Sequence, residues 1–309
     1  MGIARWIKQL PLLRGFFGER DWLRREVERL RAYETWRPPG HYYSPIPDLN
    51  EVKAKHASIF NRGADQVLGV DLRRGDQLEL LSRLQPFYDE QPFNEAPTPD
   101  HRYYFENDWF RHADALSLYM FMRLLRPKRI IEVGSGFSSS VMLDVRDRFL
   151  PGQVELTCID PETDRLMSLL RPQDHASTRI IADKVQNVGV EVFQALDAND
   201  ILFIDSSHAA KIGSDVNYLF FEVIPRLRPG VHVHVHDIVF PFEYPEKWVY
   251  DGWAWNEAYL LRAFLMFNDS FEIVLDPSFL QIKEQAYLQA HMPLMLRSQA
   301  WSFWLRRFK

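Results

Sequence analysis

Two aspartates and two histidines lie at the ends of two apolar runs in the second half of the chain, where their side chains could do chemistry. Asp205 ends the run at residues 201–205 and His208 follows it, while His236 and Asp237 lie near the end of a second run. Carboxylate oxygens and imidazole nitrogens are common ligands of divalent cations. The same groups could instead arrange general-base catalysis, in which His208 accepts a proton near neutral pH.

A glycine-containing turn precedes these residues in the chain. Residues 129–140 read Arg-Ile-Ile-Glu-Val-Gly-Ser-Gly-Phe-Ser-Ser-Ser, so an apolar run containing Glu132 leads into Gly134 and Gly136, and a helical pattern begins at Ser138. This arrangement lets a backbone approach a nucleotide-like ligand closely, because glycine adopts turn dihedrals that a side chain forbids. The dinucleotide-binding fingerprint requires a third glycine where Ser138 stands, which disfavours a NAD or FAD site.

The chain from about residue 100 onward alternates short apolar runs with helical patterns. Predicted strands cover residues 129–133, 154–160, 178–182, 201–205, 231–238 and 271–275, and predicted helices cover residues 112–125, 138–149, 162–170, 188–195, 211–227 and 256–267. Such alternation predicts an α/β fold with a mostly parallel sheet covered on both faces. Ligands bind at the carboxyl ends of the strands in these sheets, so the residues after each strand are the functional candidates.

The turn and the strand ends together resemble the class I methyltransferases that depend on S-adenosylmethionine (SAM). Glu-x-Gly-x-Gly at residues 132–136 resembles their motif I, and the resemblance covers about residues 100–280. It implies a doubly wound, Rossmann-like fold and an enzyme that binds SAM. On this chain the resemblance places the SAM site at Glu132, Gly134, Ser135, Gly136, Ser138, Asp160, Asp183 and Asp205.

Two of these assignments have alternatives. Asp160 would accept hydrogen bonds from the ribose hydroxyls, but in catechol-type relatives the ribose acid can sit two places earlier, where this chain has Cys158. Asp183 would reach the adenine amine, but a turn after a strand is as readily a solvated loop.

A second pattern resembles methyltransferases that modify sugars and other small molecules, of the macrocin, FkbM and catechol types. It is Asp-x-x-His from Asp205, followed by His-Asp-Ile from His236. The resemblance implies O-methylation of a small polyhydroxylated or glycan-type acceptor, with Asp205 and Asp237 binding magnesium and His208 as general base. His236 stands where those enzymes have a second acidic ligand. Because imidazole is a poor magnesium ligand, three alternatives stay open at Asp205, Asp237 and His236: the metal is manganese, iron or zinc, or binding is weak, or no metal is used.

Two other classes of protein stay open. One is a SAM-binding enzyme of different chemistry, such as N-methylation or a rearrangement of SAM. The other is a non-catalytic scaffold built on a methyltransferase-like domain. The glycines and the acids at the strand ends favour an enzyme over the scaffold.

Composition excludes several partners. The net charge of −5 argues against nucleic-acid binding. The single cysteine, Cys158, cannot form an intramolecular disulfide and fits a reducing compartment. No apolar run approaches the roughly 20 residues of a membrane-spanning helix, and the N-terminus lacks the apolar core of a secretory signal. We therefore expect a cytoplasmic protein whose partner is a small-molecule acceptor.

Three regions are expected along the chain. Residues 1–100 form a helical and irregular N-terminal cap, residues 101–285 the SAM-binding domain, and residues 286–309 an aromatic and basic tail. An amphipathic helix at residues 21–33 could pair with a second copy of the chain or pack on its own domain. The tail could touch a membrane surface, close a dimer, or simply dock on the domain.

The surroundings of the acceptor are also predicted by position. The aromatic loop at residues 240–255 is expected to shape the acceptor pocket, and residues 103–107 to close it from the other side. His232 and His234 share a strand face with His236 but lie deeper in the sheet, where neutral histidines can hydrogen-bond locally, so only His236 is taken as a ligand.

Overall fold

The computed structural model describes residues 11–31 and 36–309, and the side chains of residues 11–18, 30 and 31 are outside this description. The predicted N-terminal helical region therefore falls partly outside the described residues, at residues 1–10 and 32–35. The chain divides into two compact units, Met1–His56 and Ala57–Lys309.

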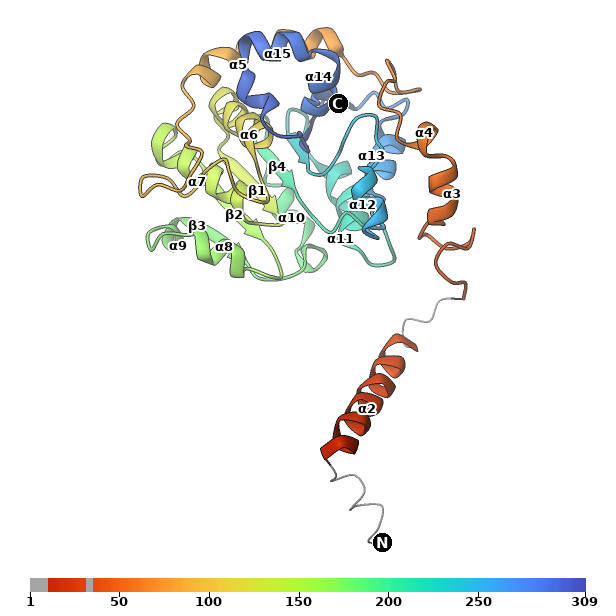
Figure 1. Cartoon of the computed structure of the whole chain (residues 1–309). Helices are drawn as coiled ribbons and strands as arrows, with labels where there is room; N and C mark the ends of the chain where they lie inside the picture. The colour runs from red at the N-terminus through yellow and green to blue at the C-terminus, as the bar shows by residue number, and fades with distance from the viewer. Residues whose placement is uncertain (1–10, 32–35) are drawn as a thin grey trace. The chain divides into compact units, whose positions relative to one another are not determined.

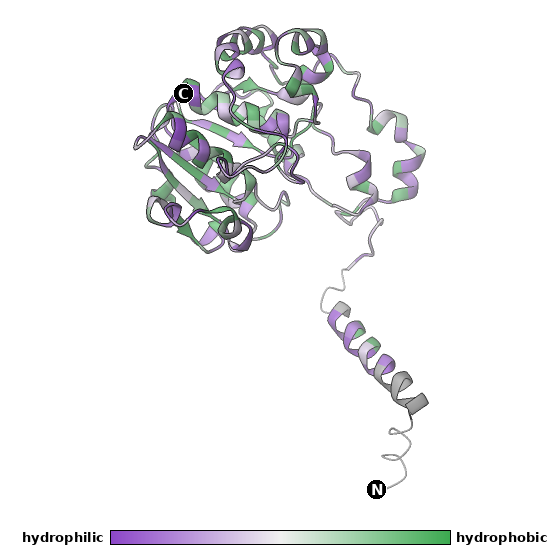
Figure 2. Cartoon of the chain, turned by 60° about the vertical axis from the view of Figure 1, so that its left-hand side comes forward, coloured by the Kyte–Doolittle hydropathy of each residue, from purple (hydrophilic) through white to green (hydrophobic). Residues whose placement is uncertain are grey.

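The described residues of the first unit include one long helix and one short one. Helix α2 covers Pro11–Arg31, and α3 covers Leu49–Ala54 (Figure 1). Asp48 caps α3, because its carboxylate accepts a hydrogen bond from the backbone N–H of Asn50 at 2.8 Å. The residues between 36 and 48 form turns and bends. Figure 2 shows the described part of α2 as mostly hydrophilic.

The second unit is built on a seven-stranded sheet with the order β3-β2-β1-β4-β5-β7-β6. The first five strands in this order are parallel to one another, and β7 runs antiparallel to both β5 and β6. The strands are β1 Arg129–Val133, β2 Glu155–Ile159, β3 Thr178–Ile181, β4 Ile201–Ile204, β5 His232–Val235, β6 Phe271–Leu275 and β7 Phe303–Arg307. This mostly parallel sheet with flanking helices confirms the predicted fold class (Figure 1).

Short helices connect and cover these strands. They are α4 His56–Ile59, α5 Arg74–Asp89, α6 His112–Leu125, α7 Phe137–Phe149, α8 Asp164–Leu169, α9 Asp174–Ser177, η1 Val185–Asn187, α10 Val190–Phe193, α11 Asp215–Tyr218, η2 Leu219–Val223, η3 Ile224–Arg226, α12 Glu246–Tyr250, α13 Glu257–Leu265, α14 Pro277–Lys283, α15 Gln285–His291 and η4 Pro293–Leu296. Among the described residues, none of the helices has both the length and the apolar composition needed to cross a bilayer.

Several predicted elements are shorter in the structure, and two of these differences bear on the site. The helix predicted at residues 211–227 begins only at Asp215, because Gly213 adopts a positive φ and Ser214 caps the first turn. The strand predicted to end at Ile238 ends at Val235, since Asp237 has a φ of 58° and cannot continue a strand. This break turns the residues after β5 toward the carboxyl edge of the sheet.

The C-terminal tail is part of the sheet, which the sequence analysis did not predict. Strand β7 inserts between β5 and β6, and Phe303, Trp304 and Leu305 are fully buried there. These side chains are therefore not available to a membrane surface or to a second subunit. The stretch was not recognised as a strand because both of its faces are covered, so apolar and polar residues do not alternate.

Candidate active site

The turn after β1 packs directly on the end of β4. Gly134 has a φ of 79°, and a Cβ at this position would lie 1.7 Å from the backbone oxygen of Asp205. Its N–H donates to the oxygen of Ile159 at 3.0 Å. Glycine is therefore required, because a side chain would collide with the backbone at the end of the neighbouring strand.

Glu132 lies beneath this turn and is fully buried. Its carboxylate accepts hydrogen bonds from the hydroxyls of Ser138 at 2.7 Å and Ser139 at 2.5 Å, which ties β1 to the first turn of α7. Burial raises the pKa of Glu132 to about 7. Glu132 was predicted to contact SAM, but it is not among the residues that line the clefts described below.

Asp160, at the end of β2, is oriented by the backbone. One carboxylate oxygen accepts from the N–H of Ser135 at 2.8 Å, and the other accepts from the N–H of Glu162 at 2.8 Å. Each oxygen keeps a second lone pair, so the half-buried carboxylate can still accept hydrogen bonds from a ligand.

A cleft of about 1040 Å³ opens over these strand ends. Gly134, Ser135, Asp160 and Asp205 line it, so part of the predicted SAM site is brought together here. Lys184, Val185 and Gln186, from the turn expected at the adenine, also line it, and Arg165 and Lys211 are lining residues that the sequence analysis missed. We call it the donor cleft.

Asp183 is not among the residues that line the donor cleft. Its carboxylate accepts hydrogen bonds from the side-chain amide of Asn187 and from the N–H of Lys184, both at 2.7 Å. The turn it begins does reach the cleft, through residues 184–186.

His208 stands between the two aspartates that follow β4 and β5. Its Nε2 lies 3.3 Å from Oδ1 of Asp205 and 3.3 Å from Oδ2 of Asp237. His208 and Asp237 adopt left-handed backbone conformations, with φ of 57° and 58°. Such conformations cost roughly 1–3 kcal/mol for a residue other than glycine and cluster at functional sites. The three ligand atoms are close enough to bind one metal ion.

A third carboxylate completes this cluster. Oε2 of Glu257, in the first turn of α13, lies 2.9 Å from Nδ1 of His208, and Glu257 is fully buried. The sequence analysis did not single out Glu257, since an acid at the start of a helix is ordinary and the contact spans 49 residues of sequence.

These charges determine the protonation of the histidine. Burial opposes a charge on His208, but hydrogen bonds to Asp205 and Glu257 outweigh it and raise the pKa of His208 well above its usual value. For Asp237, burial outweighs the neighbouring histidines and raises the pKa to about 6. With no cation bound, the surrounding carboxylates thus favour the protonated form of His208.

His236, the third predicted metal ligand, lies farther out. Its Nε2 is 3.9 Å from Oδ1 of Asp237, and its Nδ1 has no hydrogen-bond partner among the described residues. The structure therefore groups His208, not His236, with the two aspartates. His232 and His234 are buried in the sheet, where Nε2 of His234 contacts the hydroxyl of Ser302 at 3.0 Å.

A second cleft, of about 530 Å³, adjoins the donor cleft. We call it the aromatic cleft, because tryptophans line it together with the charged cluster. Both clefts are lined by Gly134, Ser135, Asp160, Arg165, Asp205, Ser206 and Ser207. The aromatic cleft alone is lined by residues that include Trp109, Phe110, His208, His236, Asp237, Trp248, Trp253, Trp255 and Trp301.

The predicted aromatic loop does line this cleft, but residues 103–107 do not, and Asp108, Trp109 and Phe110 take their place. The ring centroids of His208 and Trp255 are 4.3 Å apart. Trp301, just before β7, stacks on Trp248 with centroids 4.6 Å apart.

The backbone of Trp301 is held by Asp114 of α6. Oδ1 of this buried aspartate accepts from the N–H groups of Trp301 and Ser302 at 2.9 and 2.8 Å. The N–H of Ile238 donates to the oxygen of Trp301 at 3.0 Å, which links the ring to the turn that carries Asp237.

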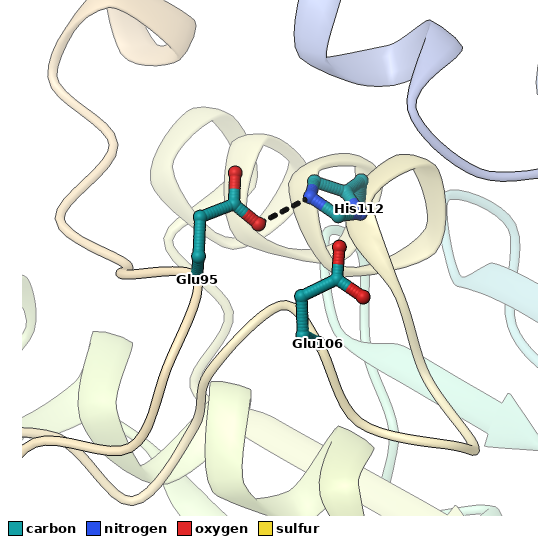
Figure 3. A group of neighbouring side chains, drawn as sticks. All are labelled: Glu95, Glu106 and His112. Atoms are coloured by element: carbon teal, nitrogen blue, oxygen red, sulfur yellow. Dashed lines mark hydrogen bonds and ion pairs between the residues drawn. The ribbon is translucent and has the colours of Figure 1, made fainter.

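A second cluster of acids and a histidine lies outside these clefts. Figure 3 shows Glu95 and Glu106 beside His112, whose Nε2 contacts Oε2 of Glu95 at 2.9 Å. Arg111 pairs with Glu106, and Arg297 lies 3.5 Å from Glu95, so arginines already balance both carboxylates. The cluster joins the loop before α6 to that helix.

Comparison with known proteins gives a family. Residues 131–238 match the model of a family described as a methyltransferase domain. An uncharacterized protein of Archaeoglobus fulgidus is 35% identical over 201 residues, which cover 63% of this chain and 84% of that protein.

Solved structures with a distant similarity include two methyltransferases. The O-methyltransferase TomG from Streptomyces achromogenes, in complex with SAM, has 14% identity and a TM-score of 0.40, and the match covers 84% of this chain and 96% of TomG. The methyltransferase PaMTH1 from Podospora anserina has 11% identity and a TM-score of 0.43, with coverage of 89% and 100%. The family match over residues 131–238, together with the sheet and its glycine turn, identifies this part of the chain as a SAM-dependent methyltransferase domain.

Proposed function

We propose that the protein transfers a methyl group from SAM to a hydroxyl oxygen of a small polyhydroxylated acceptor held in the aromatic cleft. One observation carries the proposal. The charged cluster of Asp205, His208 and Asp237 lies where the two clefts meet, and Asp205 lines both. A methyl group can pass between two ligands only at such a junction, and a hydroxyl there would be surrounded by groups that bind or remove its proton.

The donor cleft has features that suit SAM. Gly134 permits close approach to the backbone, and the oriented carboxylate of Asp160 can accept hydrogen bonds from two ribose hydroxyls. We assign the adenine end to residues 184–186, since that turn lines the cleft whereas Asp183 does not. Bound SAM supplies an electrophilic methyl group on its sulfonium.

The negative charge of the cluster can be offset in two ways. Three carboxylates surround one imidazole, so either a proton on Nε2 of His208 or a divalent cation in its place balances part of their charge. Glu257 accepts the Nδ1 proton and so directs the Nε2 lone pair toward the aspartates, as carboxylates do for metal-binding histidines.

The donor set fits a cation. Two carboxylate oxygens and one imidazole nitrogen suit manganese or ferrous iron better than magnesium, which prefers oxygen ligands. A cation held by Asp205, His208 and Asp237 would act as a Lewis acid and lower the pKa of the acceptor hydroxyl.

The protein's own residues align the acceptor and take its proton. When His208 is protonated, its positive charge holds the carboxylates of Asp205 and Asp237 in place, and it has no lone pair to accept a further proton. For the protonated form of the site we therefore assign the general base to Asp237. Asp237 lines the aromatic cleft, and its pKa of about 6 is close to the pH at which a general base works best. The hydroxyl proton passes to this carboxylate, the oxygen takes the methyl group, and S-adenosylhomocysteine leaves.

The donor assignment is tested by calorimetric titration of SAM into metal-stripped protein. Asp160→Asn should weaken binding at least tenfold, because an amide replaces the charged acceptor of the ribose hydroxyls. Asp183→Asn is the matched control and should bind SAM as the wild type does. Equal losses in both variants, or no SAM binding by the wild type, would overturn the assignment.

The cation assignment is tested by titrating manganese, ferrous iron and magnesium into the same protein in buffers of different ionisation enthalpy. A cation that displaces the proton of His208 releases about one proton per site at pH 7. The heat should disappear in Asp237→Ala. Binding without proton release, or binding that survives this substitution, would place the cation elsewhere.

A further inference from the structure

Helix α2 presents apolar side chains to solvent. Trp22, Leu23 and Val27 are 55%, 48% and 47% exposed, and none of the residues 19–29 is buried. A single helix of this length is only marginally stable in water, because its stability comes mainly from packing an apolar face. Within its own unit, none of the described residues covers this face, so it is free to pack on a partner.

The spacing of the apolar residues identifies the kind of partner. Leu23 and Val27 lie four residues apart, and Arg20 lies three residues before Leu23. The sequence continues the same alternation of three and four with Leu13, Phe16 and Leu30. These residues occupy the a and d positions of three heptads, which is the pattern of a coiled-coil seam.

The charges beside the seam are complementary to a second copy of the same helix. Glu19 occupies a g position and Arg24 the e position five residues later, and the sequence repeats this pair as Glu26 and Arg31. In a parallel pair of helices, each g residue meets the e residue that follows it on the partner, so both of these contacts join Glu to Arg. An antiparallel pair would place Glu against Glu and Arg against Arg.

We propose that α2 pairs with α2 of a second copy of this chain as a parallel two-stranded coiled coil. Leu23 and Val27 then become buried in the seam, while Trp22, at a c position, stays outside it. Arg20 is the one polar residue at the a and d positions from 13 to 30, and a polar residue there fixes the register at a cost in stability.

The charge of α2 does not favour a membrane surface as the occupant. Helix α2 contains six arginines and four acidic residues, so its polar residues are of mixed sign rather than uniformly basic. Helices that lie on anionic membranes have a basic polar face.

The first test is the mass of the full-length chain by sedimentation equilibrium. A dimer of 73 kDa is expected, twice the 36.5 kDa of one chain. Leu23→Ser and Val27→Ser should each raise the dissociation constant about a hundredfold or more, because both copies lose a buried apolar side chain. Trp22→Ser, an equally exposed apolar residue outside the seam, should leave the dimer unchanged. A wild-type monomer at 100 µM, or an equal effect of all three variants, would overturn the proposal.

The second test uses the charges. A chain with Glu19→Arg and Glu26→Arg, and another with Arg24→Glu and Arg31→Glu, should each be monomeric alone. Mixed together they should form a heterodimer, because both contacts then join opposite charges again. Failure of the mixture to associate would refute the pairing of α2 through these charges. If the wild-type chain is monomeric and floats with vesicles of phosphatidylcholine and phosphatidylserine, the partner of α2 is a membrane surface and the dimer proposal is wrong.

Discussion

His232 should make the fold sensitive to acid. It lies on β5 and is only 4% exposed, and burial, followed by the charge of Arg306, lowers its pKa from 6.5 to about 4. The folded protein therefore disfavours the protonated form. The resulting stability is fully present above pH 6.5 and is lost as the pH falls toward 4.

The size of this effect follows from the two pKa values. Between pH 8 and pH 5 the unfolded chain protonates His232 almost completely while the folded chain barely does, which removes about 2 kcal/mol of the free energy of unfolding. In His232→Gln the side chain keeps a similar size and has no proton to take up. The variant should therefore lose about 2 kcal/mol less than the wild type over the same range.

Urea denaturation of both proteins at pH 8 and pH 5 measures the difference. Comparing the two proteins cancels the other titrating groups, including Asp276, whose pKa burial raises to about 6. The same loss of stability in the wild type and in His232→Gln would refute the claim that this histidine is buried without its proton.

Three further substitutions test the site and its support. Glu257→Gln should weaken cation binding by about 10- to 100-fold and leave the SAM dissociation constant unchanged, because Glu257 orients His208 and does not line the donor cleft. Titration of each ligand measures both constants, and a loss of SAM affinity would contradict the prediction. Trp301→Ala should raise the KM for the acceptor about tenfold or more without changing SAM affinity, since the ring lines the aromatic cleft and not the donor cleft. Steady-state kinetics measures this KM, and an unchanged value would refute the prediction. Asp144→Ala should lower the free energy of unfolding by about 3 kcal/mol, because it breaks a buried ion pair with Arg102. Chemical denaturation measures this free energy, and a decrease of less than about 1 kcal/mol would contradict the importance of the pair.

Much of the fold followed from local patterns. Apolar runs separated by helical segments are enough to predict a parallel sheet, since strands buried on both faces need no alternation. The order of the strands then places Asp205 and Asp237 side by side at one edge. The turn at Gly134 was predictable because only glycine fits there: a Cβ would collide with the backbone oxygen of Asp205.

The remaining features depend on contacts that no local pattern encodes. Strand β7 joins the sheet from the far end of the chain, and Glu257 reaches His208 across 49 residues. The direction of a side chain is also invisible in the sequence, so Asp183 was predicted to face the ligand whereas its carboxylate caps its own turn. The protonation of His208 depends on three carboxylates at once.

Methyl transfer by the wild type and by Asp237→Asn tests the central claim most directly. S-adenosylhomocysteine release from SAM is measured with a panel of polyhydroxylated acceptors, together with the SAM dissociation constant. We predict turnover by the wild type and a kcat at least about 100-fold lower in the variant, with SAM affinity unchanged. Equal turnover by the two proteins would contradict the account, and so would a wild type that binds SAM but methylates none of the hydroxyl acceptors.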